Sequence, residues 1–194
     1  MAADEGEVRV LGGRPVDHLD QLGYMPQRFG LYEDLTVIQN FELYAEMRGL
    51  PEPDREATFE RLLAFTDLAR FRERLAGNLS GGMKQKLGLA CALVKTPRLL
   101  LLDEPTASLD LAHQHLTLQQ AREMAARGLA VLVVLHDLNL AARYADRLLL
   151  LHEGRVCAQG SPWEVLQVER LEQVFKVPVR VQPHPLHDCP LVLS

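Results

Sequence analysis

Two short segments of the chain carry residue types that suit phosphate chemistry. The first is LSGGM at residues 79–83, and the second is LLLLDE at residues 99–104. Ser80 and two glycines precede an apolar pattern of helical period at 83–94, which predicts a helix start. Unpaired backbone N–H groups and the positive end of the helix dipole favour an anion at such a start. The first segment therefore predicts a phosphate site.

The second segment predicts a strand that delivers two carboxylates. Residues 99–102 are apolar on both faces, as a central parallel strand requires. Asp103 and Glu104 follow at the carboxyl end of this strand, where α/β sheets bind their ligands. Carboxylates in that position suit Mg²⁺ and an attacking water. The alternative is two solvated acids at a strand end, followed by a turn at Pro105.

The order of these segments resembles the ATPase subunit of ABC transporters over roughly residues 8–165. LSGGM is similar to the family signature, and LLLLDE is similar to the Walker B strand with its catalytic glutamate. Three further elements follow the family's order: Gln27 in GYMPQ resembles the Q-loop glutamine, SLD at 108–110 resembles the D-loop, and His136 after AVLVVL resembles the switch histidine.

The resemblance implies catalytic roles for four of these residues. Asp103 would hold the Mg²⁺ shell that accompanies ATP, and Glu104 would polarise the attacking water. His136 would contact the γ-phosphate, and Gln27 would reach the metal and the water. Alternatively, His136 is a satisfied histidine at a strand end, and Gln27 is an ordinary loop residue.

The same resemblance implies that two subunits pair head to tail around ATP. Ser80, Gly81 and Gly82 would contact the nucleotide held by the second subunit, and Asp110 would cross the same interface. The alternative for Asp110 is an ordinary helix N-cap, because Ser-Leu-Asp is also a common start of a helix.

One element of the family has no counterpart in this sequence. A Walker A loop, G-x-x-x-x-G-K-[ST], needs a Gly-Lys pair, and no lysine of the chain follows a glycine. Residues 7–13 resemble the strand and turn after the family's P-loop helix, so the chain is expected to be truncated at its amino end. The β- and γ-phosphates would then lack a site within the chain, and one edge and one face of the sheet would be exposed.

The expected fold class is α/β, with a P-loop NTPase-like (RecA-like) parallel sheet flanked by helices. An inserted helical subdomain is expected, and the amino-terminal strand and P-loop are expected to be missing. Strands at 99–103, 130–135 and 147–152 alternate with helices at 111–127 and 138–145, which predicts a parallel sheet with helices on both faces.

The expected organisation follows from these patterns and the resemblance. The parts are a partial β region with the Q-loop (1–30), a helical subdomain with the signature (31–97), an α/β core (98–170) and a carboxyl-terminal tail (171–194). Thr36 is expected to cap the first helix, and residues 161–164 form a predicted capping box. Residues 8–27 predict short strands and turns.

Composition excludes several functions. The net charge of −5 and the lack of a basic stripe argue against nucleic-acid binding. The longest apolar run, 129–135, is too short to span a membrane, so membrane contact would go through a partner. Three widely spaced cysteines and an acidic start predict a reduced cytosolic protein without a signal peptide. The protein is expected on the inner face of the cell membrane, bound to permease subunits.

The remaining histidines do not predict a metal site. His113 and His115 lie two apart on a predicted helix and would point to different faces. His184, His187, Asp188 and Cys189 could ligate a metal in principle, but the prolines that flank them favour a loose surface tail.

The two ends of the chain resemble different branches of the family. Residues 23–41 and the signature look like multidrug or ABC-2 exporter ATPases, whereas residues 109–162 look like ATPases of hemin and iron-siderophore importers. One hypothesis is a junction of the two near 103–104. The expected function is the energy-coupling ATPase subunit of an importer of hemin or an iron chelate. The alternatives are an exporter ATPase, or a non-enzymatic or regulatory fragment that donates the signature to an ABC partner.

Overall fold

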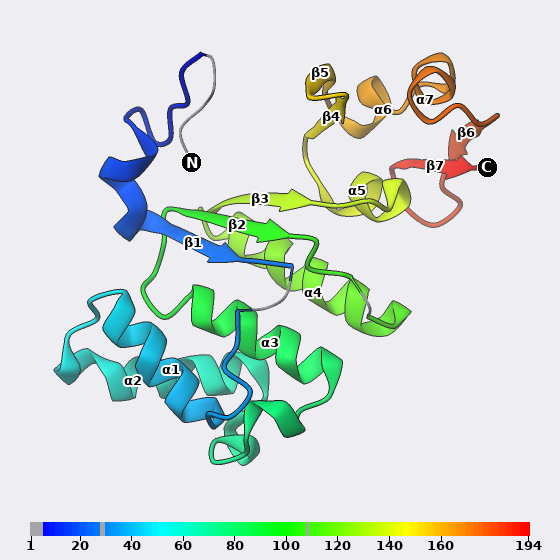
Figure 1. The fold of residues 1–194 in the computed structure, drawn as a ribbon. Helices are drawn as coiled ribbons and strands as arrows, with labels where there is room; N and C mark the ends of the chain where they lie inside the picture. The colour runs from blue at the N-terminus through cyan, green and yellow to red at the C-terminus, as the bar shows by residue number, and fades with distance from the viewer. Residues whose placement is uncertain (1–5, 28–29, 108) are drawn as a thin grey trace. The chain divides into compact units, whose positions relative to one another are not determined.

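A computed structural model describes residues 6–27, 30–107 and 109–194 of the chain (Figure 1). Its elements are η1 (Pro15–Gln21), β1 (Leu22–Met25), α1 (Val37–Met47), α2 (Glu52–Thr66), η2 (Ala69–Phe71), η3 (Ala76–Asn78), α3 (Gly81–Ala92), β2 (Leu99–Asp103), α4 (Leu111–Ala126), β3 (Ala130–Val134), α5 (Leu138–Tyr144), β4 (Leu148–His152), β5 (Arg155–Gly160), α6 (Pro162–Val165), α7 (Val168–Phe175), β6 (Arg180–Pro183) and β7 (Pro190–Leu193). The chain divides into two compact units, one of residues 1–117 and 123–134 and one of residues 118–122 and 135–194.

The first unit contains a three-stranded parallel sheet in the order β1-β2-β3. The leucine run forms the central strand, as its two-sided apolar pattern predicted. Leu100 and Leu102 are 0% exposed, and Met25 of β1 is 1% exposed. These side chains, with Gly23 in register beside Leu100, form one face of the sheet, called the covered face below.

Helices α1, α2 and α3 form the layer on one side of this sheet (Figure 1). Thr36 caps α1 in a complete capping box with Gln39, as the sequence predicted. The contact between α3 and β1 is close: a Cβ on Gly23 would lie 2.8 Å from the carbonyl oxygen of Ala92. Helix α3 begins at Gly81 rather than at 83, because the two glycines form its first turn after Ser80.

The other face of the sheet, called the open face below, carries exposed apolar side chains. Register places Tyr24, Leu101 and Leu132 side by side, and Val134 beside Asp103. Tyr24, Leu132 and Val134 are 49%, 52% and 42% exposed. The alternation of strands and helices predicted cover on both faces, but the described residues leave these side chains exposed. The family resemblance, by contrast, had led us to expect one exposed face of the sheet.

Residues 10–13 form a turn, as predicted, in which Val10 and Gly13 exchange backbone hydrogen bonds, but the segment that follows differs from the predicted strands and turns. Residues 15–21 form the 3-10 helix η1, which begins with Pro15 in its first turn. The fixed φ of proline suits a helix start, and Asp17 in the same turn binds the Arg14 side chain at 3.0 Å.

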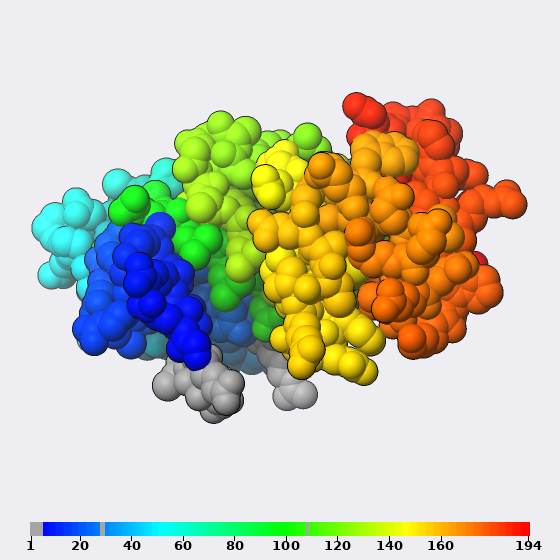
Figure 2. Space-filling view, turned by 90° about the horizontal axis from the view of Figure 1, so that it is seen from above, coloured from blue at the N-terminus to red at the C-terminus, as the bar shows by residue number. Residues whose placement is uncertain are grey.

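The second unit has its own apolar core beneath the hairpin β4–β5. Its buried members are Ala142, Leu150, Val165, Leu166, Leu171, Val174, Cys189 and Val192. Glu153 and Gly154, both with positive φ, make the turn of the predicted hairpin. Among the described residues β4 pairs with β5 alone. Figure 2 shows the yellow atoms of this hairpin against the orange atoms of α7.

The prediction of a loose tail at 184–189 is wrong. Residues 180–193 form the antiparallel hairpin β6–β7, and Cys189 and Val192 enter the core of the second unit. The hairpin is fixed to α5, because the Asn139 amide donates to the carbonyl of Val192 at 3.0 Å and accepts from its N–H at 2.8 Å.

No helix in the described ranges has the length and apolar character that a membrane crossing needs.

Candidate functional site

Asp103 is the last residue of β2, and its side chain lies on the open face. The Tyr24 hydroxyl, from the neighbouring strand β1, donates to Asp103 Oδ2 at 3.3 Å. Burial, and next the Asp103 carboxylate, raise the pKa of Tyr24, so the hydroxyl stays a donor. Sequence reasoning missed Tyr24. Strand parity was the available signal, because Tyr24 pairs with Leu101, two residues before Asp103.

Glu104 turns away from the strand in a left-handed conformation, with φ of 48°. Its N–H still donates to the carbonyl of Val134, at 3.2 Å, so β3 fixes the turn. This conformation costs an ordinary residue about 1 kcal/mol, and such outliers cluster at functional sites.

Gln27 and Glu104 are brought together across 77 positions of sequence. The Gln27 amide Nε2 donates to Glu104 Oε2 at 2.7 Å. Parallel pairing of β1 with β2 explains the contact, because both residues follow the carboxyl ends of their strands. Two of the predicted catalytic residues therefore share one site.

The donor chemistry of this site fits Mg²⁺. The ion prefers oxygen ligands, and it usually takes one or two protein carboxylates and completes its shell with waters and substrate phosphates. Asp103 supplies such a carboxylate. The side-chain carbonyl oxygen of Gln27 is a second suitable oxygen, because the Gln27 bond to Glu104 uses only the amide nitrogen. A closed protein cage is not seen: in the described ranges no three His, Cys, Asp or Glu side chains gather as a metal site.

The LSGGM segment forms a helix start, as predicted, and residues 80–82 are called the signature turn. Ser80 is the N-cap of α3, and its Oγ accepts from the N–H of Met83 at 3.3 Å. Ser80 and Gly81 are exposed. A Cβ on Gly81 would meet no other atom of the described residues within 4 Å. The turn therefore presents backbone N–H groups and a hydroxyl to its surroundings, which suits an anion.

Asp110 caps helix α4. Its Oδ1 accepts from the N–H of His113 at 2.9 Å, and both carboxylate oxygens lie 2.8 Å from His113 Nδ1. These bonds, the backbone one first, lower the pKa of Asp110. The alternative interpretation of Asp110 as an N-cap is thus observed, and its role at an interface stays a prediction. Ser108 of the same SLD element lies outside the described residues.

His136 lies in the second unit, and Asp103 and Glu104 lie in the first. It follows β3 with an exposed side chain. The next residue, Asp137, caps α5 by accepting from the N–H groups of Asn139 and Leu140. The role of His136 remains a prediction.

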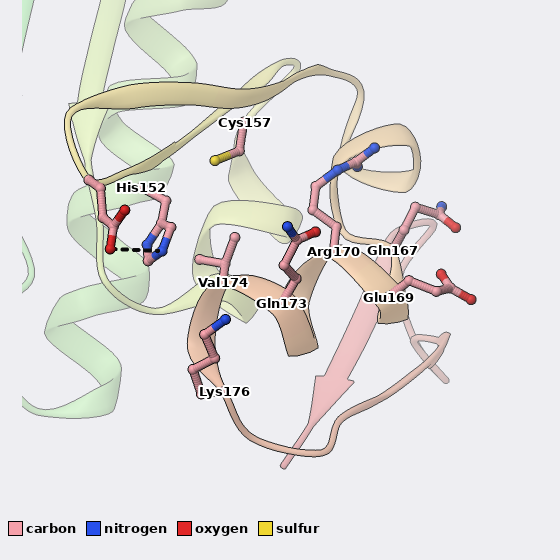
Figure 3. Close-up of a pocket in the computed structure, with 9 residues that line it drawn as sticks. His152, Cys157, Gln167, Glu169, Arg170, Gln173, Val174 and Lys176 are labelled. Carbon is pink, nitrogen blue, oxygen red and sulfur yellow. Dashed lines mark ion pairs between the residues drawn. The ribbon is translucent and has the colours of Figure 1, made fainter.

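A cavity of about 750 Å³ in the second unit contains none of the predicted site residues (Figure 3). It lies between the β4–β5 hairpin and α7, where Glu153 and Glu169 balance Arg170 and Lys176. The Arg170 guanidinium is already committed to the carbonyls of Glu164 and Val165. This lining favours no particular ligand charge.

The family model described as "ABC transporter" matches residues 1–107. The chain belongs to the ABC transporter family. The chain is 44% identical over 179 residues to the Hemin import ATP-binding protein HmuV of Vibrio cholerae, covering 89% of this chain and 69% of that protein. It is 46% identical over 171 residues to the Probable multidrug ABC transporter ATP-binding protein YbhF of Escherichia coli K12, covering 86% of this chain and 29% of that protein.

Solved structures agree with this family fold. A solved ATP-binding subunit of an ABC transporter has a TM-score of 0.70 at 32% identity, covering 89% of this chain and 71% of that one. A dimeric post-hydrolysis structure of the ATP-binding cassette MJ0796 with ADP and Pi has a TM-score of 0.64 at 30% identity, covering 73% and 63%. This ABC chain thus has the α/β fold of these ATPases.

Proposed function

We propose that this chain is part of the ATP-binding, energy-coupling subunit of an ABC transporter and acts on ATP with Mg²⁺. The observation that carries the proposal is the 2.7 Å hydrogen bond between Gln27 and Glu104, beside Asp103 at the end of β2. A carboxylate for the metal and a second carboxylate for water, held by an amide from the next strand, suit hydrolysis of a phosphoanhydride.

In this proposal each residue of the site has a distinct task. Asp103 holds the Mg²⁺ shell, with its carboxylate oriented by Tyr24. Glu104 accepts a hydrogen bond from the attacking water, and Gln27 fixes the Glu104 carboxylate. His136 would contact the γ-phosphate. Bound Mg²⁺ neutralises phosphate charge, while the chain's own residues orient the water.

The signature turn and Asp110 act on a second subunit in this proposal. Ser80 and the amides of Gly81 and Gly82 would contact ATP held by the P-loop of that subunit. The exposed turn and the open space around Gly81 support this role. The related cassette MJ0796, solved as a dimer, supports the pairing.

Hemin or an iron chelate is the transported substrate we propose, with import as the direction. The support is the 44% identity to HmuV, whose name gives hemin import. The 46% identity to YbhF supports a multidrug exporter as the second candidate. In either case the chain would act at the inner face of the membrane through permease subunits. Deletion of the gene distinguishes the two, because only an importer should be needed for growth on hemin as iron source.

The chain alone is expected to hydrolyse ATP at a negligible rate. It lacks the Gly-Lys pair of Walker A, and in phosphoryl transfer most catalysis comes from positioning and charge stabilisation. The test measures phosphate release by the purified chain with ATP and Mg²⁺, with Glu104→Gln as the matched variant. Equal background rates for both are expected. Saturable, Mg²⁺-dependent turnover that Glu104→Gln abolishes would show that the chain holds ATP by itself.

A further inference from the structure

We infer that His113 is a positioning residue that links the signature turn to Asp110. Its imidazole fills the space that Gly82 leaves and at the same time binds the Asp110 carboxylate. The inference rests on the proposed function, in which both connected groups face the second subunit.

The contact with Gly82 is the first observation. A Cβ built on Gly82 would lie 2.4 Å from His113 Cδ2 and 2.7 Å from Nε2. No real Cβ approaches a ring atom this closely, so any side chain at position 82 would displace the imidazole. Helix α3 and helix α4 therefore touch through a glycine and a histidine that are 31 positions apart in the chain.

The bonds between His113 and Asp110 are the second observation. Nδ1 lies 2.8 Å from both carboxylate oxygens, and the backbone N–H of His113 binds Oδ1 at 2.9 Å. This backbone bond is the N-cap interaction that begins α4. A side chain at position 82 would therefore displace a ring that is bonded to Asp110, so either this bond breaks or the Asp110 carboxylate moves with the ring.

The neighbouring glycine behaves differently. A Cβ on Gly81 would meet no atom within 4 Å in the described part of the chain, although Gly81 lies one residue earlier in the same turn. Packing inside the chain therefore explains why position 82 needs a glycine, but it gives no such reason for the glycine at position 81. This contrast gives the experiment a matched control.

The consequence is that the signature turn and Asp110 keep a fixed mutual position. The three described atoms nearest to a Cβ on Gly82 all belong to this imidazole, and the imidazole is also the partner of Asp110. Without the ring, this connection between the signature turn on α3 and Asp110 at the start of α4 would be lost. The signature turn and Asp110 should then be positioned less accurately against the second subunit.

The first experiment is a double-mutant cycle on the melting temperature of the whole chain, with Gly82→Ala and His113→Ala. Gly82→Ala alone should lower Tm by several degrees, because alanine displaces the ring. In the His113→Ala background the same change should leave Tm unchanged or raise it, because alanine is the better helix former. Gly81→Ala should not lower Tm. If Gly82→Ala lowered Tm equally in both backgrounds, His113 would not be what makes position 82 need a glycine.

The second experiment measures turnover when the chain is mixed with an intact ATP-binding domain whose own signature serine is replaced by arginine. At saturating folded chain, His113→Ala should lower kcat on the order of tenfold without changing the ATP concentration for half-maximal rate, because the P-loop of the partner sets ATP binding. His113→Gln, which keeps a donor for Asp110, should restore part of the rate.

The two experiments separate the inference from the proposed function. Unchanged kcat in His113→Ala would overturn the positioning role. If the wild-type chain supports no turnover at all, the proposed function fails, and the Tm cycle alone then upholds or overturns the link between Gly82, His113 and Asp110.

Discussion

The two faces of the three-stranded sheet differ in how far their side chains are buried, although the same strands form both faces. On the covered face Leu100 and Leu102 are 0% exposed, whereas on the open face Leu132 is 52% exposed. Asp103 and Tyr24 belong to the open face. The carboxylate that we assign to the metal therefore lies on the side that carries exposed apolar residues. Strand pairing brings Tyr24 to Asp103 and Gln27 to Glu104, and in the proposed function a second subunit would supply the phosphate-binding part.

The largest expected effect of this difference is on core stability. Leu102→Ala should lower the free energy of unfolding by about 2–5 kcal/mol, because it leaves a cavity in the covered face. Leu132→Ala is the matched control on the open face, and it should cost less than about 1 kcal/mol. Urea denaturation of both variants measures the difference, and equal losses would mean that the open face is covered in solution.

A second prediction concerns the buried amide of Gln85, in helix α3. Gln85 is 1% exposed, and within the described residues neither its amide nitrogen nor its amide oxygen has a hydrogen-bond partner. Gln85→Met keeps the shape of the side chain and removes both polar atoms, so the free energy of unfolding should rise by about 1–3 kcal/mol. Calorimetry of the variant checks this.

The control for Gln85→Met is the buried Asn40 of α1, whose amide donates to the carbonyls of Tyr32 and Thr36. Asn40→Leu should destabilise, because it removes the donor that those carbonyls share. A destabilising Gln85→Met would contradict the prediction and would mean that the Gln85 amide is satisfied in solution.

The smallest expected effect on stability concerns the open face itself. Leu132→Lys should change the free energy of unfolding by less than about 0.5 kcal/mol, but it should reduce concentration-dependent self-association. Met47→Lys is the control, because Met47 is 66% exposed and belongs to helix α1 instead of the sheet. Sedimentation at several concentrations distinguishes them. Equal association of both variants would contradict a special role of the open face.

Sequence patterns predicted the parts of this molecule that depend on nearby residues. The leucine strand at 99–103, the cap at Thr36 and the helix start after Ser80 lie where they were expected, and Asp110 is the N-cap that was its alternative interpretation. Each depends on residues within one turn or one strand, so periodicity and capping rules are sufficient.

Features that depend on distant contacts could not be predicted in this way. The hairpin at 180–193 is held by Asn139, 53 positions before Val192, so its prolines alone indicated a loose tail. The contact of His113 with Gly82 crosses two helices, and no local pattern reports it. The exposure of the open face was expected from the family resemblance and not from the strand pattern, which indicates only that both faces are apolar.

In the proposed function this chain donates its signature turn to another subunit, and that subunit supplies the P-loop. The most direct test mixes the chain with an ATP-binding domain that has a P-loop but whose own signature serine is replaced by arginine. Association and phosphate release are then measured with ATP and Mg²⁺. We predict ATP-dependent association and recovered turnover, which Ser80→Arg should reduce on the order of 10² to 10³-fold, the effect of losing one transition-state donor. Absence of recovered turnover, or turnover that Ser80→Arg leaves unchanged, would contradict the claim.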